Sequence, residues 1–172
     1  MANVNLVYGG ERIASGEMDA AAVAHSILTF GRFIGIVAES VHTPEVEVRT
    51  TVRGIQSGSF DIAFGIHLAE AAGVLFAAKE VNLPEVIKSV LDLLKHLNGR
   101  KPAKATHEGT KVTIENNNGN VIVVEGNVYS AAMNPETGTL TQGFVRDPLQ
   151  TIAESIEGLS RAMLIFSERR LL

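Results

Sequence analysis

Residues 45–66 read EVEVRTTVRGIQSGSFDIAFGI, two alternating segments on either side of a Gly and Ser turn. Before the turn, Val and Thr at positions 46, 48, 50 and 52 alternate with Glu, Arg and Thr. After the turn, Phe and Ile at positions 60, 62, 64 and 66 alternate with Asp, Ala and Gly. A period of two places one set of side chains on each face of a strand, and Gly and Ser favour turns. The stretch therefore predicts an antiparallel hairpin over residues 46–66 with one buried face.

A second hairpin is predicted over residues 111–125. Two runs rich in β-branched residues flank the sequence NNNGN at residues 116–120, and Asn-Gly between such runs is a strong hairpin signal. We expect both hairpins to contribute to one antiparallel sheet. A short strand over residues 4–8 is expected to turn back through residues 11–13.

Long amphipathic helices are expected to cover this sheet, which gives an α+β fold. Asp19 can cap a helix that stops before Pro44, and Pro84 suits the first turn of a helix that ends at Gly99. Spacings of three and four keep the apolar stripe of the first helix on one face. Its members are Val23, Ile27, Phe30, Ile34, Val37 and Val41.

Small and turn-forming residues predict three further features. Gly31 and Gly35 would let another backbone approach the first helix closely. A run rich in alanine over residues 67–80 favours a buried helix, and residues 134–143, rich in Pro, Gly and Thr, are expected to form an exposed loop. The hairpin residues expected to share a core with the first helix are Phe60, Ile62, Phe64, Val46, Val48 and Val52.

A last helix is predicted over residues 148–169, with Asp147 as its cap and Pro148 in its first turn. Its apolar residues follow a heptad seam. They are Leu149, Ile152, Ile156, Leu159, Met163 and Phe166. This seam either packs against the first helix or forms the contact of a homo-oligomer, for which a dimer is the first expectation.

The length of 172 residues predicts a single domain, and we expect one α+β domain spanning residues 1–172. A net charge of −4 and a pI near 5.7 disfavour nucleic acid as a partner. The chain contains no cysteine, which removes disulfides and thiolate metal ligands and favours a cytoplasmic location. The N-terminus has no signal-peptide pattern. The most apolar stretch, residues 62–78, is interrupted by His67 and Glu70, so no membrane span is expected.

The side chains carry no recognisable catalytic, metal or cofactor motif. None of the five histidines has the spacing of a helical zinc-binding pair, and no nucleophile elbow or phosphate-binding loop is present. The best acid–base group is His67 with Asp61 and Glu70, at an expected strand-to-helix junction where polar residues often act as caps. Arg32 and Arg100 could bind an anion, although such cations commonly belong to a solvated surface.

Three motifs resemble a diverse family of bacterial and phage proteins of unknown function. They are GEMD at residues 16–19, VRGIQSGSFDI at residues 52–62 and LLKHLNGRKP at residues 93–102. The resemblance spans roughly residues 4–125 and implies a bacterial or phage origin and a shared fold. It implies no activity and no functional residue. The segment from Asn127 onward departs from the family pattern.

The sequence favours a non-enzymatic, self-associating interaction protein that sequesters a small ligand, with Arg32, His67 and Arg100 as candidate contacts, or blocks a host protein. The lack of a catalytic motif and the heptad-spaced stripes on two long helices support this reading. The alternative is a small hydrolase or transferase with its site near His67, Asp61 and Glu70.

Overall fold

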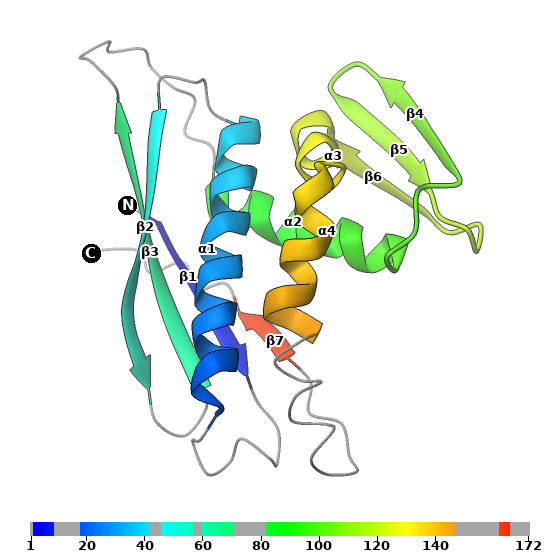
Figure 1. Ribbon diagram of the computed structural model, residues 1–172. Coiled ribbons are helices and arrows are strands. Elements are labelled where there is room, and N and C mark those ends of the chain that lie inside the picture. Colours follow the sequence, from blue (N-terminus) through cyan, green and yellow to red (C-terminus); the bar gives the residue numbers. More distant parts are fainter. Residues whose placement is uncertain are drawn as a thin grey trace, which may run out of the picture.

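The protein combines helices with antiparallel strands, so the expected α+β class is confirmed. The computed structural model describes residues 2–8, 18–41, 46–56, 60–70, 82–146 and 162–165. In chain order the elements are β1 (Ala2–Tyr8), α1 (Ala20–Val41), β2 (Val46–Gln56), β3 (Phe60–Glu70), α2 (Leu83–Leu97), β4 (Lys104–Glu108), β5 (Lys111–Glu115), β6 (Val121–Glu125), α3 (Gly126–Ala132), α4 (Pro135–Thr141), the π-helix η1 (Gln142–Arg146) and β7 (Ala162–Ile165). Figure 1 shows the helices between two separate sheets.

The strands form two sheets, not the single sheet expected. One has the order β2-β3-β1-β7, and the other has the order β4-β5-β6. Both predicted hairpins are present and antiparallel, β2 with β3 and β5 with β6. They belong to different sheets because β1 adds to the outer edge of β3, while β4 adds to the outer edge of β5. Turn chemistry sets the register within a hairpin but does not choose its neighbours.

Strand β1 lies inside the four-stranded sheet. It pairs with β3 from Ala2 opposite Ile66 to Tyr8 opposite Phe60, and its other edge pairs with β7. The expected return strand through residues 11–13 lies outside the described residues. Both described partners of β1 therefore come from later parts of the chain, where no local turn signal could predict the pairing.

The helix predicted over residues 148–169 is wrong at Ala162–Ile165, which form strand β7. A short apolar run fits a helical seam and a strand equally well. The backbone of β1 offers an edge to this run, with Val7 opposite Met163, and this pairing determines its conformation. Residues 147–161 and 166–172 lie outside the described part of the chain.

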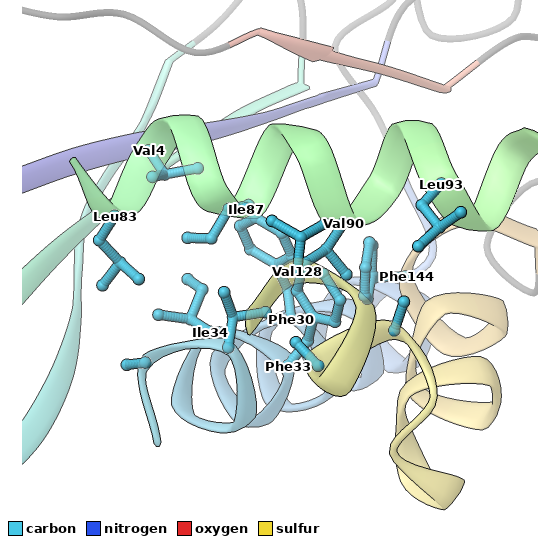
Figure 2. Close-up of a cluster of buried hydrophobic side chains, with 14 of the residues drawn as sticks. Val4, Phe30, Phe33, Ile34, Leu83, Ile87, Val90, Leu93, Val128 and Phe144 are labelled. Carbon is cyan, nitrogen blue, oxygen red and sulfur yellow. The ribbon is translucent and has the colours of Figure 1, made fainter. Parts of the chain in front are cut away.

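One hydrophobic core is shared by the helices and both sheets. Figure 2 shows side chains of α1, α2 and α3 meeting in it. Phe30 meets Phe64 of β3 and Phe144 of η1 edge-on, with ring centroids 4.9 Å apart in each pair. Ile34 and Val37 from the predicted stripe of α1 are also fully buried. The stripe of this helix is therefore a core face, as expected.

The predicted inner face of the first hairpin is only partly buried. Ile62 and Phe64 are buried, and Val48 packs against the core. Val52 was expected in the core but is 44% exposed. It lies opposite Phe64 on β2, which is an edge strand, so its side chain has sheet neighbours on one side only. The side chains of Val46 and Phe60 lie outside the described part.

A close approach was expected at Gly31 and Gly35, and the described residues show none there. Apart from the adjacent residues and the nearby backbone of α1 itself, no described atom lies within 4 Å of the place where a Cβ would stand on either residue. The close approach occurs instead at Gly143 of η1, where a Cβ would stand 2.6 Å from Thr29 Cγ2 and 2.9 Å from His25 Nε2. Gly143 therefore lets η1 lie directly against α1.

Residues 134–143 were expected to form an exposed loop, but residues 135–143 are helical. Asn134 caps α4 by accepting a hydrogen bond of 2.9 Å from the Glu136 backbone N–H, and Pro135 occupies the first turn. The hydroxyl of Thr137 is buried and donates 2.7 Å to the backbone oxygen of Ala131. Asn-Pro is a helix start as well as a turn signal, and burial against α1 and α3 favours the helix here.

Strand β3 continues to Glu70, so the helix predicted from His67 is wrong over residues 67–70. Residues 71–81 lie outside the described part. Among the described residues, the one helix with the length and apolar composition of a membrane span is α1. Core helices pass the same test, and the buried face of α1 contributes to the shared core.

Candidate functional site

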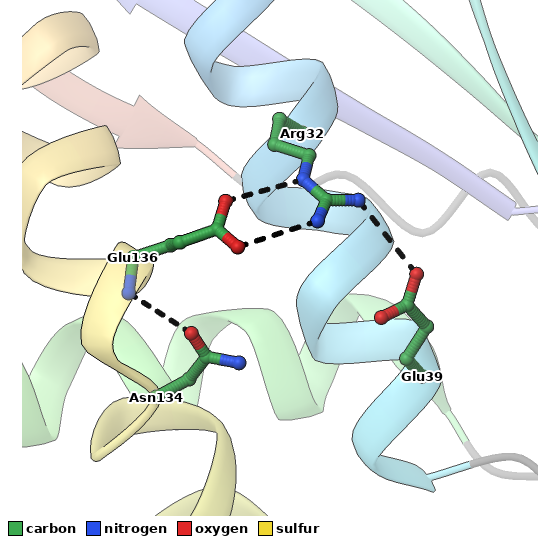
Figure 3. Close-up of polar contacts among 4 residues, drawn as sticks. All are labelled: Arg32, Glu39, Asn134 and Glu136. Carbon is green, nitrogen blue, oxygen red and sulfur yellow. Dashed lines mark hydrogen bonds and ion pairs between the residues drawn. The ribbon is translucent and has the colours of Figure 1, made fainter.

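Arg32, a predicted anion ligand, is engaged by two carboxylates. Its Nε and Nη2 atoms donate to the two carboxylate oxygens of Glu136, both at 3.5 Å, and Nη1 lies 3.8 Å from Glu39 Oε1 (Figure 3). The three side chains are between 51% and 65% exposed, so each pair contributes only about 0.2–1 kcal/mol. Arg32 thus links α1 to α4, and its charge is already balanced.

His67, Asp61 and Glu70 all lie on β3. His67 lies six positions after Asp61, which corresponds to about 20 Å along a strand. Their side chains lie outside the described part. The backbone alone therefore places Asp61 far from His67. His67 lies within β3 and not at the expected strand-to-helix junction.

Arg100 lies just beyond the end of α2, where Asn98 and Gly99 adopt positive φ angles of 49° and 73°. Its side chain is exposed, as are those of Lys101 and Lys104. No ion pair among the described residues includes Arg100. These cations form a solvated surface at the end of the helix.

Of the six predicted interface residues, only Met163 is described. It lies on β7, opposite Val7 in the backbone pairing, and its side chain lies outside the described part. The other five lie outside the described residues: Leu149, Ile152, Ile156, Leu159 and Phe166.

The outer edge of β6 is the strongest interaction feature of the described surface. β6 ends the three-stranded sheet. Backbone hydrogen bonds from Asn116 N–H to Asn120 O (2.9 Å) and from Gly126 N–H to Thr110 O (2.7 Å) flank the β5–β6 ladder. Bonded pairs alternate along an antiparallel ladder, so the even-numbered residues of β6 bond to β5. Val121 and Val123 consequently direct their N–H and C=O groups away from β5.

The side chains of Val121 and Val123 are also exposed. Their exposed fractions are 59% and 55%, which are large for apolar residues in a sheet. On the same face, the neighbouring positions of β5 carry Glu115 and Thr113. Val121 and Val123 therefore form an apolar strip beside a polar surface, along a strand with open backbone groups.

The opposite edge of this sheet is polar. On β4 the side chains of Lys104, Thr106, His107 and Glu108 are exposed. Charged residues on an edge strand prevent unwanted pairing. β6 has no Lys or Pro and carries four consecutive apolar β-branched residues, Val121 to Val124. The two edges of one sheet thus differ in their capacity to accept a further strand.

A rigid turn holds β6 in place. The buried side chain of Asn116 accepts hydrogen bonds from the backbone N–H groups of Asn118 (2.9 Å) and Asn120 (3.0 Å), and it donates 3.0 Å to the backbone oxygen of His96. Gly119 adopts a φ of 79°, which glycine tolerates. The hairpin is therefore fixed to the end of α2 and presents a preformed edge.

A cavity of about 270 Å³ lies beside the same strand. Its lining comes from α2, β5, β6 and α3: Ser89, Lys111, Val123, Val124, Glu125 and Val128. The valines make it partly apolar, and Lys111 and Glu125 lie opposite each other in the β5–β6 register. Arg32 and Arg100, whose side chains are described, do not line it.

The sequence signal for this site was present but incomplete. The Asn-Gly turn predicted the hairpin, and the run VIVV at residues 121–124 is unusual for a strand with a solvated face. The sequence could not show which of the two hairpin strands would remain at an edge. That depends on β4, which pairs with β5.

Among the side chains that the structure describes, no group of three or more His, Asp or Glu residues is placed to hold a metal ion. No protein-family model, curated protein or solved structure matches this chain.

Proposed function

We propose that this is a non-enzymatic interaction protein that binds an extended segment of a protein partner by adding it to the outer edge of β6. The observation that carries the proposal is the combination of outward-directed backbone groups and exposed side chains at Val121 and Val123. Strand addition draws affinity from backbone hydrogen bonds and specificity from alternate side chains. β6 offers both on a preformed support.

Other observations favour binding over catalysis. Arg32 is balanced by Glu39 and Glu136, and Asp61 is about 20 Å from His67 along β3. A protein partner fits the open edge better than a small anion does. The absence of cysteine supports a cytoplasmic setting, in keeping with the expected bacterial or phage origin.

A proline substitution at the edge tests the proposal. Val123→Pro removes an N–H that points away from β5, so the sheet ladder keeps its hydrogen bonds, and proline is tolerated at such positions. Val123→Thr is the matched control because it keeps the N–H and the β-branched shape. The probe is a fluorescein-labelled peptide of alternating Thr and Val, and binding is measured by anisotropy.

We expect the intact chain and Val123→Thr to bind this peptide with similar affinity. Val123→Pro should weaken binding at least about tenfold, while its circular dichroism spectrum matches that of the intact chain. Equal binding by the folded proline variant, or no binding to the intact chain up to about 1 mM peptide, would exclude strand addition at β6.

A further inference from the structure

We infer that the strand received by β6 is β6 of a second copy of the chain, in an antiparallel two-fold pair that joins two three-stranded sheets into one. This inference rests on the proposed function, because it names the partner of the same edge. A two-fold axis requires a surface that is complementary to itself, and an antiparallel strand pair has this property.

The open backbone groups define the register. On each copy, Val121 and Val123 direct N–H and C=O groups outward, whereas the C=O of Glu125 is the helix-cap carbonyl of α3. Pairing Val121 of one copy with Val123 of the other uses all of the outward groups of these two residues, in both directions. Ile122 then lies opposite Ile122 of the second copy, on the two-fold axis.

The side chains suit the same register. Val121 and Val123 lie on one face, so the four exposed valines of the two copies would cover one another in two cross-strand pairs. The stretch from Val121 to Val124 carries no charge. Glu125 lies beyond the paired residues and opposite Lys111 of its own sheet. No like charges therefore face each other across the joint.

The polar outer edge of β4 explains why assembly would stop at two copies. After β6 pairs with β6, the edges of the joined sheet are the two β4 strands, which carry Lys104 and Glu108. Charged edges resist further pairing. The contact is small beside the roughly 1,200 Å² or more of stable complexes, so we expect dissociation constants in the micromolar range or weaker.

Sedimentation of the intact chain from about 1 µM to about 500 µM tests the assembly. We expect a reversible monomer–dimer equilibrium that Val123→Thr keeps and Val123→Pro weakens at least about tenfold. Ala105→Pro is the matched control: by the same alternation its N–H points away from β5, but on the polar edge. Its dimerisation should match that of the intact chain.

Single cysteines test the register, since the natural chain has none. Two directly opposed residues in a non-hydrogen-bonded pair have Cα atoms about 4.5 Å apart, within the range of a disulfide. Ile122→Cys should therefore cross-link rapidly to its symmetry mate under mild oxidation. Val121→Cys and Val123→Cys should cross-link slowly. In this register, each of these residues lies two positions away from the same residue of the other copy.

The outcomes separate this inference from the proposed function. A monomer at all concentrations overturns the second copy as partner, while peptide binding that is lost in Val123→Pro would still support strand addition. A dimer that persists in the folded Val123→Pro variant places the contact elsewhere and also overturns the inference. Preferential cross-linking of Val121→Cys or Val123→Cys overturns the register.

Discussion

The hydroxyl of Tyr8 donates a hydrogen bond of 2.5 Å to the backbone oxygen of Phe144, 136 positions later in the chain. The bond joins the central strand β1 to η1 inside the core, where both side chains are fully buried. Burial raises the pKa of Tyr8 from 10.0 to about 12, and a hydrogen bond with Ser26 opposes part of this rise. The folded protein therefore holds the phenolic proton more tightly than the unfolded chain does.

Alkaline pH should destabilise the protein through Tyr8. Because the folded pKa is the higher one, the stabilisation is complete below about pH 10 and is lost as the pH rises toward about 12. A shift of two units corresponds to roughly 3 kcal/mol. Urea unfolding of Tyr8→Phe should show a weaker loss between about pH 9 and pH 12 than the intact chain. The control Tyr129→Phe should keep the steep loss; equal slopes for the intact chain and Tyr8→Phe would contradict the assignment.

Phe64→Ala should lower the free energy of unfolding by about 3–5 kcal/mol, through lost burial and a cavity. Phe64 is 1% exposed and meets Phe30 edge-on. Val52, which lies opposite Phe64 on β2 and is 44% exposed, provides the control. Val52→Ala should cost less than about 1 kcal/mol. Denaturation curves with similar midpoints for the two variants would show that this face of β3 is not core.

Gly143→Ala should destabilise the protein by about 1–3 kcal/mol, because its Cβ would meet Thr29 Cγ2 at 2.6 Å. Thr29→Ser removes that methyl group and should recover part of the loss in the double variant. Gly35→Ala lies on α1 with no described atom near its Cβ, and should stabilise the helix by up to about 1 kcal/mol. Thermal melting of the parent, Gly143→Ala, the double variant and Gly35→Ala would test these expectations. A melting temperature of Gly143→Ala at or above that of the parent contradicts the close contact.

Asn116→Ala should cost about 2–3 kcal/mol, because it leaves the backbone groups of Asn118, Asn120 and His96 without their partner. Asn118→Ala is the control, since that side chain is exposed, and should be close to neutral. Hydrogen exchange in the β5–β6 ladder should rise only in the first variant. Unchanged exchange would mean that the turn does not depend on this side chain.

Local signals predicted the local structure well. The Asn-Gly turn specified β5 and β6, the alternation over residues 46–66 specified β2 and β3, and Asp19 caps α1 through a hydrogen bond of 2.9 Å from the Ala22 N–H. Each of these features involves residues no more than 24 positions apart, the separation of Val46 and Glu70 in the β2–β3 pair. Such contacts are encoded in turn residues, caps and periodicity, which a single sequence displays.

Distant pairings and the interaction edge could not be predicted in the same way. β1 pairs with β3 and β7, and Ala162–Ile165 form a strand although their spacing also fits a helix. Residues 134–143 have the composition of a loop, but residues 135–143 are helical because Thr137 and Phe144 are buried. The edge of β6 is open because β4 pairs with β5, which leaves β6 at the end of the sheet. In each case the deciding partner lies elsewhere in the chain.

The position of β1 between β3 and β7 has a consequence for synthesis on the ribosome. β3 ends at Glu70, whereas β7 ends at Ile165, so 95 residues are translated between the arrival of the two neighbours of β1. At about 5–20 residues per second, that takes roughly 5–20 seconds. During this interval the nascent chain carries a β1 edge without its second strand, and until Phe144 is added the Tyr8 hydroxyl also lacks its hydrogen-bond acceptor. The growing polypeptide therefore keeps one edge of β1 open to wrong pairing until its last described strand emerges.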